Sequence, residues 1–250
     1  PDRPHFSSTK SSAVIVANAA RDHEKAVLWA LSAGVPALVE KPVALSAIAA
    51  KRLADFAQKT KICLAAAHVF LFAGYLEKYS KLITRTGNIR LLRMHWIDPK
   101  FENRYGEQKS YDTGLPVFAD CLPHIVSIFG SLMPSVTQKC EKLEFKRGGA
   151  KLKLRIILGD TPCDVLLERN GNERKRMIEA LTEQKTFKLD FSFEPGIIDN
   201  GTKKISGDPY WYVKKGPVAQ MLTAFLRQAA GGEIDNRLDI EIAIRAARVI

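Results

Sequence analysis

The first seventy residues alternate between short apolar runs and amphipathic stretches. Residues 13–17, 36–39 and 62–66 are continuously apolar, which is typical of strands buried on both faces of a parallel sheet. Between the runs, apolar residues recur at helical spacing, Gly34 stands where the first helix should stop, and Ser46 is a good N-cap for the second. Strand, helix, strand, helix, strand with short links predicts a partial doubly wound parallel sheet of the Rossmann type.

The pattern changes after residue 68. Helical and strand-like stretches now follow one another in a different order, joined by glycine-containing turns at 147–149 and 170–172. The predicted elements are a helix over 72–84, a strand over 89–96, a helix from 117 to 129, several strands between 136 and 193, and helices over 218–228 and 239–250. The sequence therefore predicts two domains. Residues 1–68 form the C-terminal part of a dinucleotide-binding domain, and residues 69–250 form an α+β domain with a mostly antiparallel open sheet.

Composition narrows the class of protein. The chain has 250 residues, of which 46 % are hydrophobic, enough to build a sizeable core. No run approaches the ~18 apolar residues of a membrane helix, so a spanning protein is excluded, and no basic-then-apolar signal peptide is present. The four cysteines stand singly, which excludes a zinc ribbon and argues against a disulfide-stapled secreted scaffold. We therefore expect a cytoplasmic protein.

The charge favours anionic partners. Lys and Arg together number 38 against 27 Asp and Glu, a formal net charge of +11. This balance suits nucleic acid, anionic lipid, or a phosphorylated or carboxylated small molecule. However, the basic residues of 151–155 alternate with apolar ones, as in a strand with one solvated face, and no nucleic-acid-binding motif accompanies them. The sequence thus argues against nucleic-acid binding and favours a small-molecule substrate.

Two strand ends carry candidate chemistry, because ligands of open parallel sheets bind beyond the carboxyl ends of the strands. The first is the polar turn from Asn18 to His23, and the second is Glu40-Lys41-Pro42. Pro42 restricts Lys41 to an extended conformation and makes a cis peptide bond possible. Lys41 is therefore a candidate proton donor or substrate clamp, and the alternative is a plain surface ion pair with Glu40.

A second constellation lies in the predicted helix after residue 116. Asp120 and His124 are four residues apart and so share one helix face, where they can converge on one ligand. The alternative is a solvated or N-capping role. A metal site lacks a third ligand at diagnostic spacing, so none is expected. His68, which closes a strand, is a candidate to line the same cleft.

Together these segments resemble the Gfo/Idh/MocA family of oxidoreductases. The resemblance covers nearly the whole chain and is carried by these segments: the strand Ala13 to Asn18, His23, Ala33-Gly34, Leu38-Val39-Glu40-Lys41-Pro42, Leu45-Ser46, the helix with Asp120 and His124, and Phe225-Leu226 followed by Gly231-Gly232. The resemblance implies a dinucleotide-binding domain, NAD or NADP as hydride carrier, and a sugar, cyclitol or related polyol as substrate. It also implies an open C-terminal sheet that often mediates oligomers, so a homo-oligomer is expected.

The resemblance also implies residue roles. Lys41, Asp120 and His124 match the family's catalytic lysine, aspartate and histidine. His124 would be the acid/base, with a pKa near neutrality, Asp120 would orient it or hold a substrate hydroxyl, and Lys41 would polarise the carbonyl oxygen. The positions that match the lining of the nicotinamide end of the cofactor are Asn18, Ala19, His23, Glu40, Lys41 and Pro42.

Some features depart from the family pattern. No G-x-G-x-x-G occurs, so roughly two βα units, on the order of 50 residues, are expected to be absent from the start of this sequence. Residues 111–116 replace a glycine-rich run, and Ser127 stands where the family often has an aspartate. Both bear on substrate choice. The polar loop 102–107, with Arg104 and Tyr105, is a candidate replacement for contacting substrate, together with His68.

The sequence therefore predicts an NAD(P)-dependent oxidoreductase acting on a small polar carbonyl or alcohol, sugar-like or anionic. The alternative is a non-catalytic ligand-sensing or interaction protein that retains the same fold.

Overall fold

The small parallel sheet predicted at the start of the chain is present. The computed structural model describes residues 13–104, 106–108, 115–134, 136–213 and 215–249. The first sheet has the parallel order β1-β2-β3. Its elements are β1 (Val14–Val16), a 3-10 turn at Ala20–Asp22, α1 (His23–Ser32), β2 (Ala37–Val39), α2 (Ala47–Thr60) and β3 (Leu64–Ala66). Oγ of Ser46 accepts a hydrogen bond from the backbone N–H of Ala49 at 3.2 Å, so the predicted N-cap is confirmed.

Burial of the three strands is uneven. Every residue of β2 and β3 is buried, as the apolar runs predict. The same prediction is wrong for β1, where Ile15 is 57 % exposed. The reason is position, because β1 lies at the edge of the described sheet and only β2 pairs with it.

The second part of the chain forms an eight-stranded sheet with the order β13-β12-β11-β10-β4-β9-β8-β7. Its strands are β4 (Ile89–Pro99), β7 (Gln138–Lys146), β8 (Lys151–Leu158), β9 (Thr161–Gly171), β10 (Lys175–Thr182), β11 (Thr186–Asp190), β12 (Ile197–Asp199) and β13 (Lys204–Ser206). Only the pair β4–β9 is parallel, and the other neighbours are antiparallel. The expected fold class, a partial Rossmann sheet followed by a mostly antiparallel open sheet, is confirmed.

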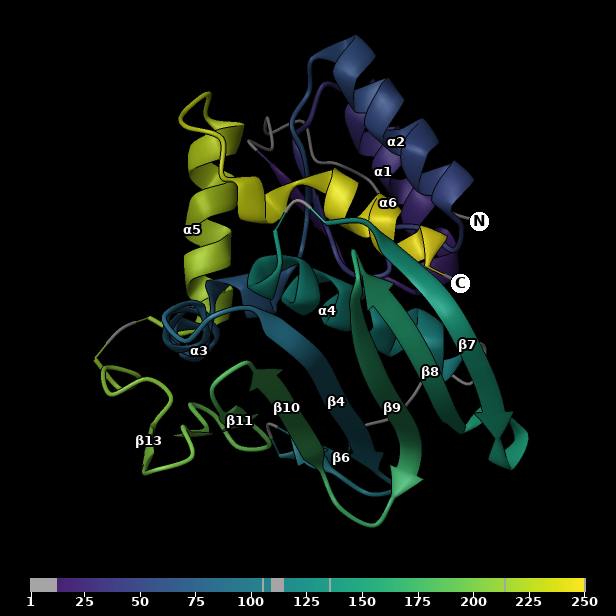
Figure 1. Cartoon of the computed structure of the whole chain (residues 1–250). Coiled ribbons are helices and arrows are strands. Elements are labelled where there is room, and N and C mark those ends of the chain that lie inside the picture. The colour runs from purple at the N-terminus through teal and green to yellow at the C-terminus, as the bar shows by residue number, and fades with distance from the viewer. Residues whose placement is uncertain (1–12, 105, 109–114, 135, 214, 250) are drawn as a thin grey trace.

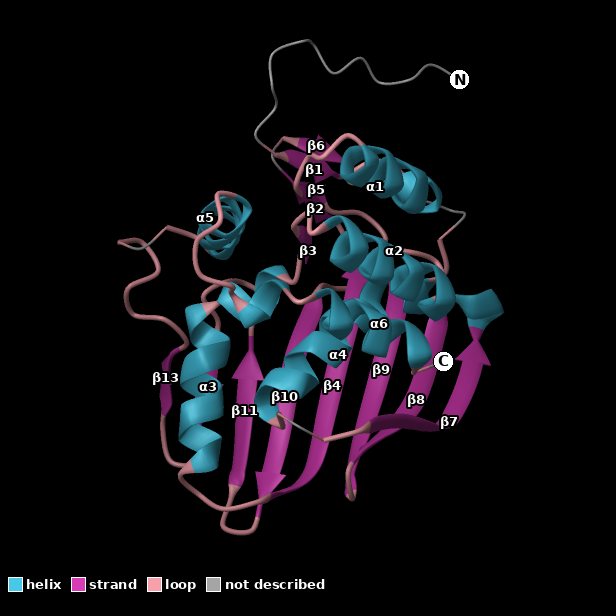
Figure 2. Ribbon diagram, turned by 90° about the horizontal axis from the view of Figure 1, so that it is seen from above, coloured by secondary structure: helices cyan, strands magenta, loops and turns pink. Residues whose placement is uncertain are grey.

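Helices cover one face of this sheet and leave the other open (Figure 2). The covering helices are α3 (Gly74–Thr84) and α4 (Val117–Leu132), and a 3-10 turn at Val69–Phe72 precedes α3. Inward residues of the strands, such as Met94 and Leu167, join Phe129 of α4 in the main core. On β8, buried residues alternate with the outward Lys151, Lys153 and Arg155. The predicted strand with one solvated face is therefore confirmed.

The last helices return to the first sheet. They are α5 (Pro217–Ala229) and α6 (Ile240–Arg248), with a 3-10 turn at Asn236–Leu238 between them, and a short hairpin of β5 (Asn103–Arg104) and β6 (Glu107–Gln108) stands apart. Ala243 and Ile244 of α6 are buried in the same cluster as Val39 and Leu53. Figure 1 shows α6 running between α2 and α4. This helix therefore bridges the two sheets.

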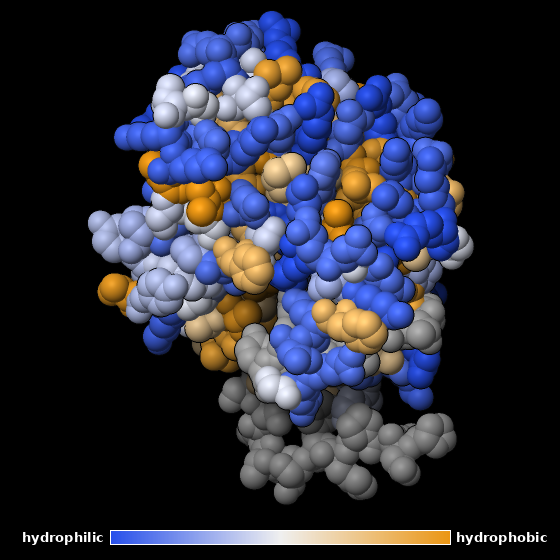
Figure 3. Space-filling view, turned by 90° about the horizontal axis from the view of Figure 1, so that it is seen from below, coloured by the Kyte–Doolittle hydropathy of each residue, from blue (hydrophilic) through white to orange (hydrophobic). Residues whose placement is uncertain are grey.

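The hydropathy of the surface and of the helices can be compared with that of a membrane protein. Figure 3 shows one face of the molecule as mostly hydrophilic, with hydrophobic residues in small separate groups. Within the described ranges, no helix combines the length and the apolar character that crossing a membrane requires.

Candidate functional site

The strand-end loops of the small sheet are tied together by a buried histidine. Nδ1 of His23 lies 2.8 Å from the carbonyl oxygen of Pro42, and Nε2 lies 3.0 Å from that of Asn18. His23 thereby fixes the loop after β1 against the loop after β2, with Ala19 beside it at the start of the 3-10 turn. The Lys41–Pro42 peptide bond is cis, as the sequence allowed. The predicted cofactor-binding positions thus lie together at the carboxyl edge of the sheet.

Lys41 reaches from this edge to helix α4. Its Nζ donates to the backbone carbonyl of Asp120 at 3.0 Å and forms an ion pair with Oδ1 of the same residue. Both side chains are about one fifth exposed. The structure therefore brings together Lys41 and Asp120, which are 79 residues apart in the chain, and it places them in an ion pair that the sequence analysis did not consider.

The other carboxylate oxygen of Asp120 is held by Arg169 of β9. Nη2 of Arg169 lies 2.8 Å from Oδ2, and Nη1 donates to the carbonyl of Leu115 at 2.6 Å. Burial alone would raise the pKa of Asp120, but the ion pairs with Lys41 and Arg169 outweigh it and lower the pKa to about 2. Asp120 is therefore a carboxylate with both oxygens engaged.

His124 lies one helical turn beyond Asp120 and is only 8 % exposed. Its ring stacks on Trp96 with centroids 5.3 Å apart, and it meets the edge of Phe70 at 4.9 Å. Burial, followed by the positive charge of Lys41, lowers the pKa of His124 well below its usual value. The expectation of a near-neutral pKa is therefore wrong, because an aromatic enclosure disfavours the imidazolium. No hydrogen bond between Asp120 and His124 occurs in the part of the chain that the structure describes.

A buried ion pair lies against Trp96, the residue on which the ring of His124 stacks. The guanidinium of Arg176 lies 3.9 Å from the centroid of the Trp96 ring, and it pairs with Asp98, both side chains being 3 % exposed. Arg176 also donates to the carbonyl of Ile97 at 2.7 Å. These contacts fix Trp96, and through it the ring of His124, against the large sheet.

Of the remaining predicted residues, those that the structure describes take no part in the ion pairs of Asp120. Glu40 accepts a hydrogen bond from the backbone N–H of Lys41 at 3.2 Å. His68 is 1 % exposed, and burial, followed by the charge of Arg245, lowers its pKa to about 4. Arg104 ends β5, but its side chain, like the whole of Tyr105, lies outside the described residues. Arg169, Trp96 and Arg176 were not predicted. Nothing in the local sequence pattern around these three residues singled them out.

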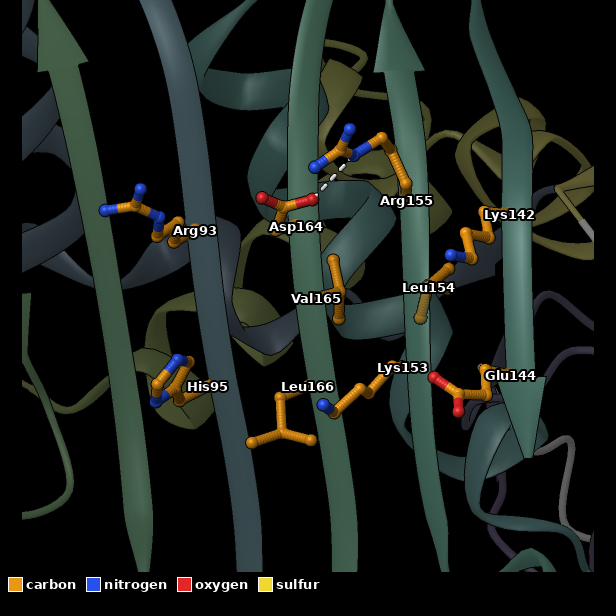
Figure 4. A pocket seen from close by; sticks show the side chains of 10 residues that line it. All are labelled: Arg93, His95, Lys142, Glu144, Lys153, Leu154, Arg155, Asp164, Val165 and Leu166. Carbon is orange, nitrogen blue, oxygen red and sulfur yellow. Dashed lines mark hydrogen bonds and ion pairs between the residues drawn. The ribbon is translucent and has the colours of Figure 1, made fainter. Parts of the chain in front are cut away.

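The open face of the large sheet carries a hollow of about 510 Å³ that is distinct from this cluster (Figure 4). Charges alternate across the strands in register, in the order Lys188, Glu179, Arg93, Asp164, Arg155. Nε of Arg155 pairs with Oδ1 of Asp164 at 2.7 Å, and Glu179 pairs with both Arg93 and Lys188. The row has three cations and two carboxylates, so its charges offset one another except for one net positive charge. Among the described residues no group of three His, Cys, Asp or Glu could hold a metal.

A parallel βα edge with a strand-end lysine is joined here to a helix-backed open sheet, and ligands of open parallel sheets bind beyond the carboxyl ends of the strands. Residues 4–68 match the model of the Gfo/Idh/MocA oxidoreductase family, described as an NAD-binding Rossmann fold. The resemblance to this family is confirmed, and with it the expected cofactor class, NAD or NADP, at the level of the family. A search of curated protein sequences finds no match.

Solved structures share the fold over almost the whole chain. One is the UDP-N-acetylglucosamine 3-dehydrogenase from Acidithiobacillus ferrooxidans, with 19 % identity over 94 % of this chain and 75 % of that one, at a TM-score of 0.71. Another is a 3-ketoreductase from Actinomadura kijaniata, solved with TDP-benzene and NADP, with 16 % identity over 95 % of this chain and 75 % of that one, at a TM-score of 0.78. At these identities the likeness establishes the fold.

Proposed function

We propose that the protein is an NAD(P)-dependent oxidoreductase that transfers a hydride between nicotinamide and a sugar-like or anionic carbonyl or alcohol. The observation that carries the proposal is the Lys41–Asp120 ion pair, which brings the strand-end lysine of the small sheet to the helix bearing His124. An ammonium, a neutral imidazole and a carboxylate next to an open Rossmann edge suit chemistry in which a proton moves on the oxygen of a carbinol carbon.

The residues at the edge fit the nicotinamide end of the cofactor. Asn18 is exposed, Glu40 is half-buried, and His23 holds their two loops at a fixed separation. This leaves an open, rigid edge of the sheet beside Lys41. There the nicotinamide ring would be held by Asn18, Ala19, Glu40 and Pro42. When bound, the nicotinamide supplies or accepts the hydride at the substrate carbon.

We assign the proton to Lys41 and the orientation of the substrate oxygen to His124. Because the pKa of His124 is far below neutrality, its ring is neutral and offers one hydrogen bond to that oxygen. In the reducing direction Nζ of Lys41 gives one proton to the carbonyl oxygen while the carbon takes the hydride, and Lys41 is left as a neutral amine. Oxidation is the reverse. Asp120, held by Arg169, keeps Lys41 in place.

The substrate proposal rests on charge and on the structural neighbours. One neighbour is a nucleotide-sugar 3-dehydrogenase and another a 3-ketoreductase, and the net charge of +11 favours an anionic group on the substrate. We further propose two domains divided near residue 68, and a cytoplasmic location, which the four free cysteines support. A homo-oligomer would form through the open sheet face, since the alternating row on that face can complement a second copy of itself.

The test is nicotinamide turnover by the full-length protein with UDP-N-acetylglucosamine and related nucleotide sugars. We expect an absorbance change at the nicotinamide band with NAD or NADP. Turnover should fall at least a hundredfold in Lys41→Ala, on the scale of lost acid–base catalysis, and about a hundredfold in His124→Ala, on the scale of a lost hydrogen bond to the reacting oxygen. Lys51→Ala, on the exposed face of α2, is the matched control. Full turnover in both site variants would refute the residue assignment. Binding of a sugar nucleotide without any turnover would favour the ligand-sensing alternative.

A further inference from the structure

A small cavity lies beside Lys41, between the loop after β2, helix α4 and helix α6. Its volume is about 110 Å³, room for roughly three water molecules at the ~30 Å³ that each occupies in the liquid. The lining ranges from the fully buried His68 to Leu45, which is 60 % exposed. The cavity therefore reaches from the interior of the site toward the surface.

His68, which lines this cavity, has an unpartnered ring nitrogen. Nε2 of His68 is fully buried with no partner among the described residues. A neutral imidazole has one donor and one acceptor nitrogen, and either role leaves Nε2 without a hydrogen bond here. A buried polar atom of this kind calls for a hydrogen-bonding partner, most simply an ordered water.

Two further polar groups meet the same cavity. Pro123, within α4, has no N–H, so the carbonyl of Ala119 lacks its ordinary helical donor, and both residues line the cavity. Lys41 has three N–H donors, of which two are used on the carbonyl and carboxylate of Asp120. A lysine N–H, a helix carbonyl and an imidazole nitrogen around one small cavity form a set of partners that a bound water satisfies.

We propose that this cavity is a hydrated chamber whose ordered water links Nζ of Lys41 to Nε2 of His68 and to the surface, giving Lys41 a proton-exchange route separate from the substrate cleft. The proposal rests on the proposed function, because it takes Lys41 as the group that moves the proton. With substrate and nicotinamide covering the cleft side of Lys41, the chamber is the remaining contact with solvent. His68 is then a positioning residue that orients the water.

The proton balance closes without a further reactant. In the reducing direction the substrate oxygen takes one proton from Lys41, whose nitrogen becomes a neutral amine. A chamber water then gives a proton to that nitrogen, and bulk water replaces the proton along the chain of waters. In the oxidising direction the amine takes the hydroxyl proton and releases it by the same route. His68 stays neutral throughout and only holds the water by a hydrogen bond.

The first test is structural and needs no substrate. Crystals of the full-length protein are examined at high resolution, with and without xenon under pressure, since xenon enters dry apolar cavities. We expect ordered water within hydrogen-bonding distance of Nε2 of His68, and no xenon. Xenon bound in the cavity, or a cavity empty of both, overturns the proposal.

The second test fills the chamber. Ala247, half-buried on α6, lines it, so Ala247→Leu should displace the water while Ala247→Ser should keep it. We expect kcat to fall roughly tenfold in Ala247→Leu, part of the contribution of proton transfer, with KM unchanged and a larger solvent deuterium effect. Ala247→Ser should retain the kcat of the unmodified protein. Ala229→Leu, the same change at a half-buried position of α5, is the control.

The two tests separate the possible failures. Ordered water without turnover of any nucleotide sugar would refute the proposed function and the proton route with it, and would leave the hydrated cavity standing. Turnover with the same kcat and isotope effect in Ala247→Leu as in the unmodified protein would refute the proton route and leave the proposed function standing.

Discussion

Nη2 of Arg169 lies 2.8 Å from Oδ2 of Asp120, and this ion pair fastens the large sheet to the helix that carries the candidate site. Lys41 of the small sheet's loop holds the other oxygen of the same carboxylate. Three charged groups from three separate elements therefore converge on one point. Their sum is one net positive charge, which suits stabilisation of a developing alkoxide.

Replacing Arg169 should release Asp120. In Arg169→Met we expect the pKa of Asp120 to rise from about 2 toward the usual 3.8, because one of its two cationic partners is lost. Turnover should fall about tenfold, equivalent to about 1.4 kcal/mol. Carbon-13 NMR titration of the carboxyl measures the pKa. Arg169→Lys keeps the positive charge, so the pKa of Asp120 in this variant should remain at about 2. An unshifted Asp120 in Arg169→Met would contradict this role.

The Asp98–Arg176 pair should be costly to break on one side. Arg176→Met leaves the carboxylate of the buried Asp98 without this cation, and we expect a loss of about 3–5 kcal/mol in the free energy of unfolding. The double variant Asp98→Asn, Arg176→Met should recover part of that loss, because no buried charge remains. Urea unfolding of the three proteins measures the effect. A double variant no more stable than Arg176→Met would speak against charge burial as the cause.

Stability should fall as the pH drops through the histidine range. The pKa of His68 is about 4 in the folded protein against 6.5 for an unperturbed histidine, so the unfolded chain binds more protons between these values. Its stabilising contribution is fully present above pH 6.5 and is lost as the pH falls toward 4, by roughly 3 kcal/mol. His124 adds a loss in the same direction.

Urea unfolding at pH 7, 5.5 and 4.5 measures this slope. His68→Gln should flatten it, while His95→Gln, at a half-exposed position, should change it less. An identical slope in His68→Gln would mean that another group controls the acid lability.

Gly207 should tolerate no side chain. A Cβ there would lie 2.1 Å from the carbonyl oxygen of Pro195 and 2.8 Å from Cβ of Tyr75. Gly207→Ala must therefore push backbone apart, and we expect a loss of about 1–3 kcal/mol. Gly216→Ala is the control, because nothing lies within 4 Å of its Cβ position. Thermal unfolding should show a clear fall in Tm for Gly207→Ala. For Gly216→Ala the free energy of unfolding should change by no more than about 0.5 kcal/mol.

Local patterns in the sequence were sufficient for the helices and the longer strands and for two residues of the site, but not for the short strands β5, β6, β12 and β13. The apolar runs located all three parallel strands, and Ser46 and Gly34 marked helix ends that the structure confirms. Spacing alone put Asp120 and His124 on one helix. The exposure of Ile15 was missed because the burial of a strand depends on its place in the sheet, and an apolar run does not encode that place.

The electrostatics of the site could not be predicted, because its partners come from distant segments. Arg169 is 49 residues from Asp120 and Arg176 is 78 residues from Asp98. The pKa of His124 depends on Trp96 and Phe70, which only the folded chain brings to it. The roles of Arg104 and Tyr105 remain predictions.

The packing of α6 against α2 has a consequence for how the molecule is made. Ala243 and Ile244 complete the hydrophobic cluster under the first sheet, yet about 180 residues of chain separate them from the end of α2. During synthesis on the ribosome the first sheet therefore emerges long before the helix that closes it. Until α6 arrives, the apolar faces of α2 and β3 remain uncovered, and nascent chains should bind chaperones at those faces.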